Sequence, residues 1–234
     1  MIYQSSFENN CIIATTIDDA WRIAISLCVR NGYHQVIEGS ISKDKGGSYI
    51  GQTRKQLEDV KITIKYPYIR PLAPITPVDV PPPTSDEKIV NYFINYLMDD
   101  QHLLPNEEYR YATWIIPQLQ TIIEKLRISN GNTNQATITI GDSNSVRLKD
   151  PPCLKLISFK VVNMKLNMSV FFRSWDLMAG FPENIGGLQL LKEFVLQSLH
   201  YNLSIIDGSI ICYSDGLHLY DHFWDLADKL TIKG

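Results

Sequence analysis

The cysteine of Asp150-Pro151-Pro152-Cys153 is the first candidate for chemistry. Because proline restricts backbone rotation, the two prolines deliver the thiol rigidly to the first residue of an apolar strand pattern. A thiolate needs such a fixed position, with positive charge nearby, to act as a nucleophile. A buried structural cysteine is the alternative, and the local sequence taken by itself favours it.

An arginine and a serine follow a second apolar strand pattern, in Arg173-Ser174-Trp175-Asp176. The planar guanidinium group matches a phosphate or carboxylate, and the serine adds a hydroxyl donor. The alternative is a surface ion pair of Arg173 with Asp176, which would contribute less than about 1 kcal/mol.

Two further segments hold polar side chains suited to a nucleoside. Asn184 lies in a Gly-rich segment before an apolar helix pattern, and its amide offers the acceptor and donors that the imide edge of uracil requires. Capping of the helix is its alternative role. His218 and Tyr220 are two residues apart, so they share one side of an extended segment and could hold a sugar hydroxyl. We find no third ligand at a recognisable metal spacing, and therefore expect no metal site.

The elements that must position these residues alternate between helix and strand signals, which predicts a mixed α and β fold in a single domain, residues 1–234. A Thr84-x-x-Glu87 capping box opens one helix, residues 40–56 are expected to form a loop, and the prolines of 71–83 an extended crossing. The expected helices are 17–31, 84–98, 115–128, 188–199 and 221–230, and the expected strands are 60–66, 136–140, 154–161, 166–172 and 209–213.

Composition excludes several classes of function. The 234 residues carry 22 Lys and Arg against 25 Asp and Glu, a net charge of -3, which argues against bulk nucleic-acid binding. No stretch approaches the length of a membrane span, and the N-terminus lacks a signal-peptide pattern. The four cysteines are scattered without CxxC pairs, which indicates a reducing, cytoplasmic setting.

The order of the four motifs along the chain identifies a protein family more specifically than any single motif does. P-P-C, then R-S-x-D, then G-x-P-x-N-I, then H-x-Y resembles the thymidylate synthase family, over about Tyr109 to His222. The short N-terminal half and the Pro-rich segment resemble its compact archaeal branch. The resemblance implies an α+β fold with a mixed sheet flanked by helices, and a homodimer formed sheet to sheet.

The same resemblance implies the reductive methylation of dUMP to dTMP, with methylene-tetrahydrofolate or a related pterin as co-substrate. Cys153 would be the nucleophile that adds to the pyrimidine ring, and Tyr111 would assist proton removal from the ring. Arg173 and Ser174 would hold the nucleotide phosphate, with Arg54 contributing.

The remaining roles that the resemblance implies concern the base, the sugar and the folate. Asn184 would bind the uracil edge, and His218 and Tyr220 the ribose hydroxyl. Asp176 would help to bind the folate ring and to order water near the base, and Gly180 would line the folate side.

The sequence departs from the family pattern at several positions. Asn134 stands where the family has a basic pair that reaches the partner's phosphate, Ala112 replaces the glycine after the motif tyrosine, and residues 85–98 hold no clear counterpart of the catalytic glutamate. Two alternatives therefore stay open: a pyrimidine nucleotide hydroxymethylase that shares the Cys153 step, and a diverged nucleotide-binding protein with little activity.

Overall fold

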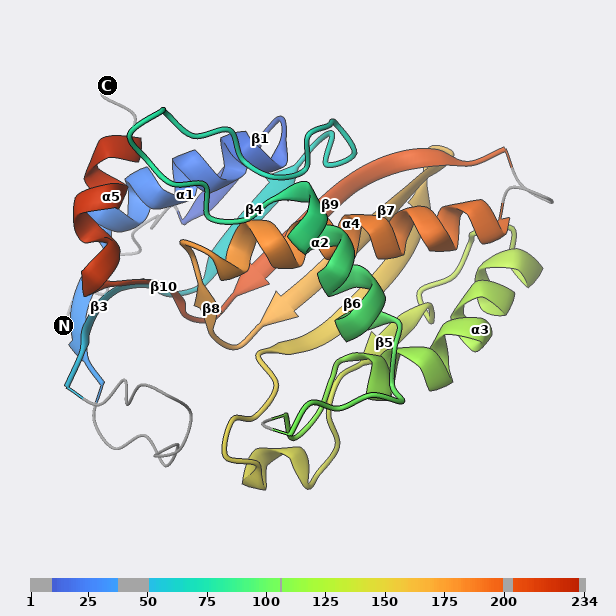
Figure 1. Ribbon diagram of the computed structural model, residues 1–234. Helices are drawn as coiled ribbons and strands as arrows, with labels where there is room; N and C mark the ends of the chain where they lie inside the picture. The colour runs from blue at the N-terminus through green and yellow to red at the C-terminus, as the bar shows by residue number, and fades with distance from the viewer. Residues whose placement is uncertain (1–9, 38–50, 106, 200–203, 232–234) are drawn as a thin grey trace, which may run out of the picture.

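Two β-sheets organise the molecule (Figure 1). The computed structural model describes residues 10–37, 51–105, 107–199 and 204–231. The large sheet has the strand order β1-β4-β9-β7-β6-β5, and the small sheet has the order β2-β3-β10-β8. The strands are β1 Cys11–Ala14, β2 Tyr33–Val36, β3 Thr53–Leu57, β4 Val60–Ile64, β5 Thr137–Thr139, β6 Leu154–Val162, β7 Lys165–Phe172, β8 Trp175–Asp176, β9 Ile206–Ser214 and β10 Leu217–Tyr220.

Both sheets are mixed, which agrees with the mixed sheet that the resemblance implies, although two sheets are present where one was expected. In the large sheet β1 pairs with β4 and β7 with β9 in parallel, whereas β4–β9, β6–β7 and β5–β6 are antiparallel. The helices are α1 Ile17–Asn31, α2 Asp86–Tyr92, α3 Ala112–Ile128, α4 Gly180–Leu199 and α5 Trp224–Leu230, with a π-helical turn at Phe93–Leu97 and 3-10 turns at Ser145–Arg147 and Asp221–Phe223.

The structure confirms the hairpin that the sequence pattern predicts, formed by β6 and β7. Asn163 and Met164 form the two-residue turn with φ of 51° and 59°, the geometry whose twist matches that of the adjoining strands. Every second residue of β7, from Leu166 to Phe172, is buried. The hairpin brings the start of β6 and the end of β7 to the same end of the sheet.

Helix α1 begins and ends where the sequence predicts. Thr16 and Asp19 form a reciprocal capping box, and the chain leaves the helix at Gly32. The indole nitrogen of Trp21, which is fully buried, donates to the carbonyl oxygens of Leu177 and Met178 at 3.0 and 3.1 Å. This contact ties α1 to the segment between β8 and α4.

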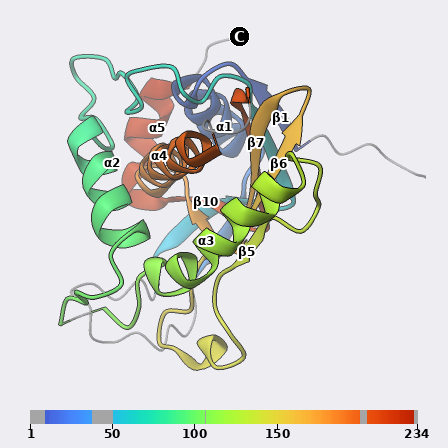
Figure 2. The same ribbon diagram turned by 90° about the vertical axis from the view of Figure 1, so that its right-hand side faces the viewer.

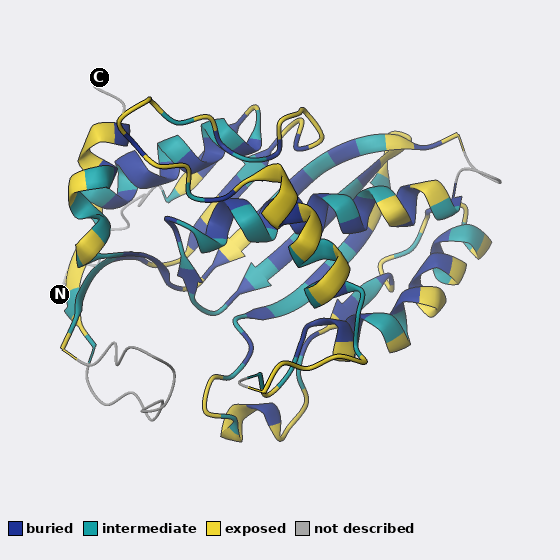
Figure 3. Ribbon diagram, in the orientation of Figure 1, coloured by how far each residue is buried: buried dark blue, intermediate teal, exposed yellow. Residues whose placement is uncertain are grey.

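The helices lie mainly on one side of the large sheet. Figure 2 shows α1 and α4 on the same side of its strands, and both helices contact strands of that sheet. Buried residues concentrate in α1, α4 and the strands beneath them, whereas α2 carries many exposed residues (Figure 3). No helix in the described part of the chain is long and apolar enough to cross a membrane.

Two sequence predictions near the site are wrong in detail. The N-cap of α2 is Ser85, whose hydroxyl accepts from the Lys88 amide, and the buried Thr84 instead donates to Glu183 at 2.8 Å. Ser85 can take the N-cap position predicted for Thr84 because its side chain also carries a hydroxyl group. The predicted loop 40–56 ends in a strand, β3, which pairs with β2 and β10; residues 40–50 lie outside the described part.

Candidate functional site

Cys153 and Arg173 meet at one end of the β6–β7 hairpin. Cys153 immediately precedes β6 and Arg173 immediately follows β7, and the Arg173 amide donates to the Cys153 carbonyl at 2.9 Å. The Arg173 guanidinium also donates to the carbonyl oxygens of Pro152, at 3.2 Å, and Pro151. The P-P-C and R-S-x-D motifs therefore form one structural unit.

Burial and nearby positive charges act in opposite directions on the thiol of Cys153. The pKa of the half-buried Cys153 thiol is raised above its ordinary value, chiefly because burial disfavours the thiolate. The positive charge of Arg173 opposes this effect, the negative charge of Asp150 adds to it, and Lys155 acts in the same direction as Arg173. Arg173 therefore favours the thiolate, but burial outweighs its effect.

Tyr111 contacts the backbone next to Cys153. Its hydroxyl oxygen accepts a hydrogen bond from the amide of Leu154 at 3.2 Å. The pKa of Tyr111 is raised, first by burial and next by the charge that a Cys153 thiolate would carry. Tyr111 therefore stays protonated beside the cysteine.

Replacing Tyr111 with phenylalanine is expected to lower the free energy of unfolding by about 1–3 kcal/mol, because the buried Leu154 amide loses its acceptor. Chemical denaturation measures this difference. Tyr68→Phe, at a more exposed tyrosine, is the matched control and should change stability by less than about 0.5 kcal/mol. Equal stability of Tyr111→Phe and the parent chain would contradict the role of this hydrogen bond.

An aromatic cluster surrounds Tyr111 that the sequence analysis missed. Tyr92 and Tyr96 stack at 5.5 Å between ring centroids, Tyr96 meets Tyr111 edge-on at 5.1 Å, and Tyr109 lies 5.2 Å from Trp114. The i, i+4 spacing of Tyr92 and Tyr96 could have indicated that the two rings lie on one helical face. Burial raises the pKa of all three tyrosines other than Tyr111.

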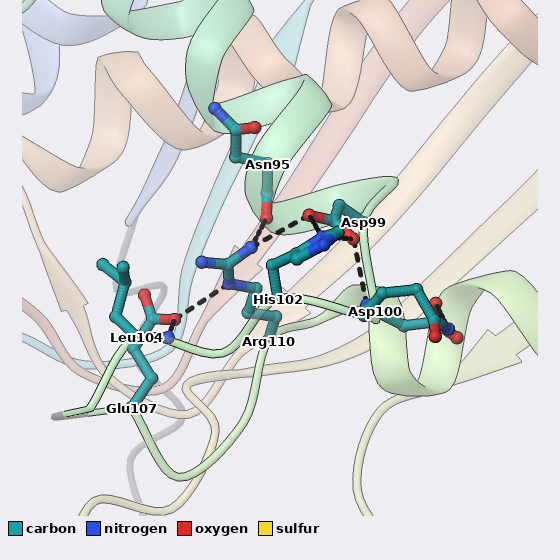
Figure 4. A network of polar contacts seen from close by, with 8 residues as sticks. Asn95, Asp99, Asp100, His102, Leu104, Glu107 and Arg110 are labelled. Carbon is teal, nitrogen blue, oxygen red and sulfur yellow. Dashed lines mark hydrogen bonds and ion pairs between the residues drawn. The ribbon is translucent and has the colours of Figure 1, made fainter.

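Arg110 anchors the segment that leads into this cluster (Figure 4). Its buried guanidinium donates to Glu107 at 2.8 Å, to the Asn95 carbonyl at 2.8 Å and to Asp99 at 3.3 Å. These contacts join the chain just before Tyr111 to the π-helical turn that carries Tyr96. Arg110 therefore helps to set the position of Tyr111 against β6.

Arg110→Leu is expected to reduce the free energy of unfolding by about 2 kcal/mol. The substitution removes the guanidinium that pairs with the Asp99 and Glu107 carboxylates. The expected loss is smaller than for a fully buried ion pair because these carboxylates are partly solvated. Equilibrium urea denaturation provides the measurement. His102→Ala removes a member of the same network that is 82% exposed, and is expected to have little effect; similar losses in both variants would refute an anchoring role for Arg110.

The small sheet contributes a second group of site residues. Arg54 on β3 pairs with Tyr220 on β10, and His218 pairs with Gln56. The Arg54 guanidinium donates to the Gln35 side chain at 3.2 and 2.9 Å. The pKa of the buried His218 is lowered to about 4, mainly by burial and then by Arg54, with a smaller effect of Arg173 in the same direction. His218 is thus neutral at pH 7 and is close enough to both arginines to respond to their charge.

The start of α4 holds the remaining predicted residues. Asp176 accepts hydrogen bonds from the amides of Met178, Ala179 and Gly180 at 3.0, 3.3 and 3.1 Å. It therefore caps the helix, and burial raises its pKa despite these bonds. The helix begins at Gly180, so the alternative role of Asn184 as its cap is wrong: Asn184 is inside the helix, and its Oδ1 accepts from the Trp175 indole at 3.0 Å.

Asn184 and Ser174 both keep hydrogen-bonding capacity. An amide oxygen has two lone pairs, so Asn184 Oδ1 can accept a second bond. The Ser174 hydroxyl has no hydrogen-bond partner within the described ranges. In those ranges there is also no group of three or more His, Cys, Asp or Glu residues that could hold a metal ion.

Comparisons with known proteins show what the chain as a whole is similar to. A thymidylate synthase family model matches residues 96–233, more than half of the chain. The chain is 26% identical to a protein of Methanosarcina mazei named "Putative thymidylate synthase", over 99% of both chains, and 23% identical to the thymidylate synthase of Buchnera aphidicola, over 63% of this chain and 57% of that protein.

The fold has a solved counterpart. The structure of thermostable thymidylate synthase A from Bacillus subtilis superposes with a TM-score of 0.63 at 15% identity, over 92% of this chain and 84% of the other. The family match and the shared mixed α and β architecture lead to one conclusion: the chain belongs to the thymidylate synthase family.

Proposed function

We propose that the chain catalyses the reductive methylation of dUMP to dTMP, with methylene-tetrahydrofolate or a related pterin as carbon donor. The observation that carries this proposal is the convergence of Cys153, Arg173 and Tyr111 at the end of the β6–β7 hairpin. Family membership supports the same reaction class.

In the proposed reaction the sulfur of Cys153 adds, as a thiolate, to the pyrimidine ring of dUMP. The electron pair displaced from the ring double bond makes the neighbouring ring carbon nucleophilic, and that carbon forms the new carbon–carbon bond. The folate supplies the one-carbon unit and the hydride: both bonds between folate nitrogens and that unit break during the transfer, and dihydrofolate leaves. Tyr111, which stays protonated, assists while the ring proton passes to solvent water. The bond to Cys153 breaks as the hydride arrives, and the thiolate is restored.

The nucleotide would be held by residues at the ends of three elements. Arg173 and Ser174 at the end of β7, with Arg54 on β3, would bind the phosphate through charge-assisted hydrogen bonds. Asn184 would bind the uracil edge, and His218 and Tyr220 the sugar. Asn134 is exposed and uncharged, so we assign it no part in phosphate binding.

An open hollow beside the aromatic cluster would hold the flat ring of the carbon donor. It has a volume of about 280 Å³, and its lining includes Tyr92, Tyr96, Glu107 and Glu183. Aromatic faces stack on a flat ring, and carboxylates accept hydrogen bonds from its N–H groups. Asp176 and Gly180 at the start of α4 would complete the folate side.

We also propose that two chains associate through the face of the large sheet opposite α1 and α4. Ile13 is 68% and Tyr213 40% exposed on this face, and Phe171 and Tyr213 line a hollow there of about 280 Å³. Analytical ultracentrifugation should report twice the 26.7 kDa chain mass, and Tyr213→Asp should shift the distribution toward the monomer. A parent chain that stays monomeric at micromolar concentration would refute the dimer.

The activity is tested by incubating the purified chain with dUMP and methylene-tetrahydrofolate and analysing the nucleotide by mass spectrometry. A gain of one methyl group, with dihydrofolate formed in equal amount, is the expected result. A hydroxymethyl product would overturn the reductive step. Bound dUMP without any product, with either folate or a related pterin as donor, would overturn the catalytic proposal and favour a nucleotide-binding protein.

A further inference from the structure

A buried tryptophan contacts the amide of Asn184, the residue proposed to bind the uracil edge. The Trp175 indole nitrogen lies 3.0 Å from Asn184 Oδ1. An indole N–H only donates, so the amide atom that faces it must be the oxygen, and the NH₂ group must point away from the ring. The contact therefore determines which end of the Asn184 side chain is the acceptor and which is the donor.

The indole of Trp175 has little freedom to move. The residue is 3% exposed, and its ring stacks on Phe172 at 3.8 Å between ring centroids and lies 4.8 Å from the ring of Phe181. The Trp175 backbone amide donates to the Gly216 carbonyl at 2.9 Å, next to the pairing of β8 with β10. Contacts from β7, from α4 and from the segment before β10 therefore fix the position of the indole donor.

A half-turn of the Asn184 amide is unfavourable in this arrangement. Such a turn exchanges Oδ1 and Nδ2, which would place the amide N–H groups against the indole N–H. The indole would lose its acceptor, and a buried donor without a partner is costly because its interaction with water is not replaced. The amide of Asn184 therefore keeps one orientation.

The amide remains accessible to a ligand. Asn184 is partly exposed, whereas Trp175 is buried. Residue 180 is a glycine, and a Cβ placed there would lie 3.7 Å from Asn184 Oδ1, so no side chain of that residue covers the oxygen. Oδ1 has a second lone pair and the NH₂ group offers donors. A ligand therefore meets an acceptor and a donor in a fixed order.

The order of donor and acceptor is what distinguishes uracil from cytosine. Uracil presents a carbonyl acceptor at C4 beside an N–H donor at N3, whereas cytosine presents an amino donor at C4 beside an acceptor at N3. An amide that can turn over matches both edges, because it can exchange its two ends. An amide held in one orientation matches one edge and places like groups against the other, which rejects that base.

We propose that Trp175 is a positioning residue for base specificity: its indole N–H holds Asn184 in the orientation that pairs with uracil and rejects cytosine. This inference rests on the proposed function, which assigns the uracil edge to Asn184. Trp175 occupies the position of R-S-x-D that the motif leaves open, so none of the motifs in the sequence includes it.

The test compares the affinities of dUMP and dCMP by isothermal titration calorimetry. The parent chain is expected to bind dUMP about tenfold more tightly, because dCMP leaves polar groups of the amide mispaired. Trp175→Phe retains an aromatic ring but removes the indole N–H. It should lower the ratio about threefold or more, chiefly because dCMP binds more tightly than it does to the parent. A purely structural defect would weaken the binding of both nucleotides.

Further variants assign the effect to the amide. Asn184→Ala has no amide to orient, so adding Trp175→Phe to it should leave the ratio of the two affinities unchanged. Trp224→Phe removes an indole N–H that donates to the Leu219 carbonyl at 3.2 Å, on a different helix, and should behave as the parent chain.

Thermal unfolding checks that each variant is folded. If Trp175→Phe does not fold, incorporation of β-(3-benzothienyl)alanine at position 175 preserves the ring shape and replaces the indole N–H with sulfur. The same change in the ratio is expected for it.

An unchanged preference for dUMP in a folded chain that lacks the indole N–H would overturn the positioning role and leave the proposed function intact. Equal affinity of the parent chain for dUMP and dCMP would also overturn the positioning role. Failure of the parent chain to bind dUMP would overturn the proposed function, and the inference with it.

Discussion

Replacing Cys153 with alanine is expected to reduce dTMP formation by about 10⁴-fold or more, since the variant lacks the sulfur that forms the covalent bond to the pyrimidine ring. Binding of dUMP should remain measurable, because the proposed contacts to phosphate, base and sugar come from Arg173, Asn184 and His218. Steady-state turnover and calorimetric titration with dUMP measure the two quantities separately.

Cys11→Ala is the matched control for this experiment. Cys11 is an exposed free cysteine on β1, on an element that contributes no proposed site residue. Turnover in this variant should match that of the parent chain. Turnover that persists in Cys153→Ala would exclude the covalent mechanism, whereas loss of dUMP binding together with turnover would assign Cys153 a structural role.

The second large effect is expected for Arg173→Leu, which should weaken dUMP binding about 10- to 100-fold. The range corresponds to the loss of charged hydrogen bonds to the phosphate. The same substitution should raise the pKa of Cys153 further, because Arg173 is the first of the charges that lower it. The rate of alkylation of Cys153 by iodoacetamide, followed against pH by intact mass, reports that pKa.

The direction of the pH dependence follows from the chemistry of the thiol. The reactive form is the thiolate, so the alkylation rate of the parent chain should rise with pH and level off above the raised pKa of Cys153. In Arg173→Leu the curve should move to higher pH. Lys155→Gln is the control: Lys155 has a smaller influence on the same pKa and no proposed phosphate contact, so dUMP affinity should be kept. Superimposable curves for Arg173→Leu and the parent would contradict the electrostatic coupling.

Some features of the fold could be predicted from the sequence because the determining interactions are local. The capping box of α1 depends on Thr16 and Asp19, three residues apart. The β6–β7 hairpin depends on alternating apolar residues and a two-residue turn at Asn163. The N-cap of α2 was predicted at Thr84 and lies at Ser85, an error of one residue.

Other features depend on strand partners that are far apart in sequence. Most of β3 was predicted as part of a loop because residues 40–56 are polar and Gly-rich, yet β2 and β10 pair with it on its two sides. Gln56 therefore could not be associated with His218, which lies more than 160 residues later in the chain. Arg110 likewise gains its partners only through the packing of its segment on the π-helical turn.

For this protein the sequence by itself determined the types and order of the reactive groups, together with the helices and hairpin that local pattern encodes. The tertiary structure alone decided the states of those groups: a thiol whose pKa is raised and a neutral histidine. The physical reason is that desolvation and charge depend on which atoms surround a group in space. Those neighbours come from strands and helices far apart in the sequence, and a local sequence pattern does not predict how they pair.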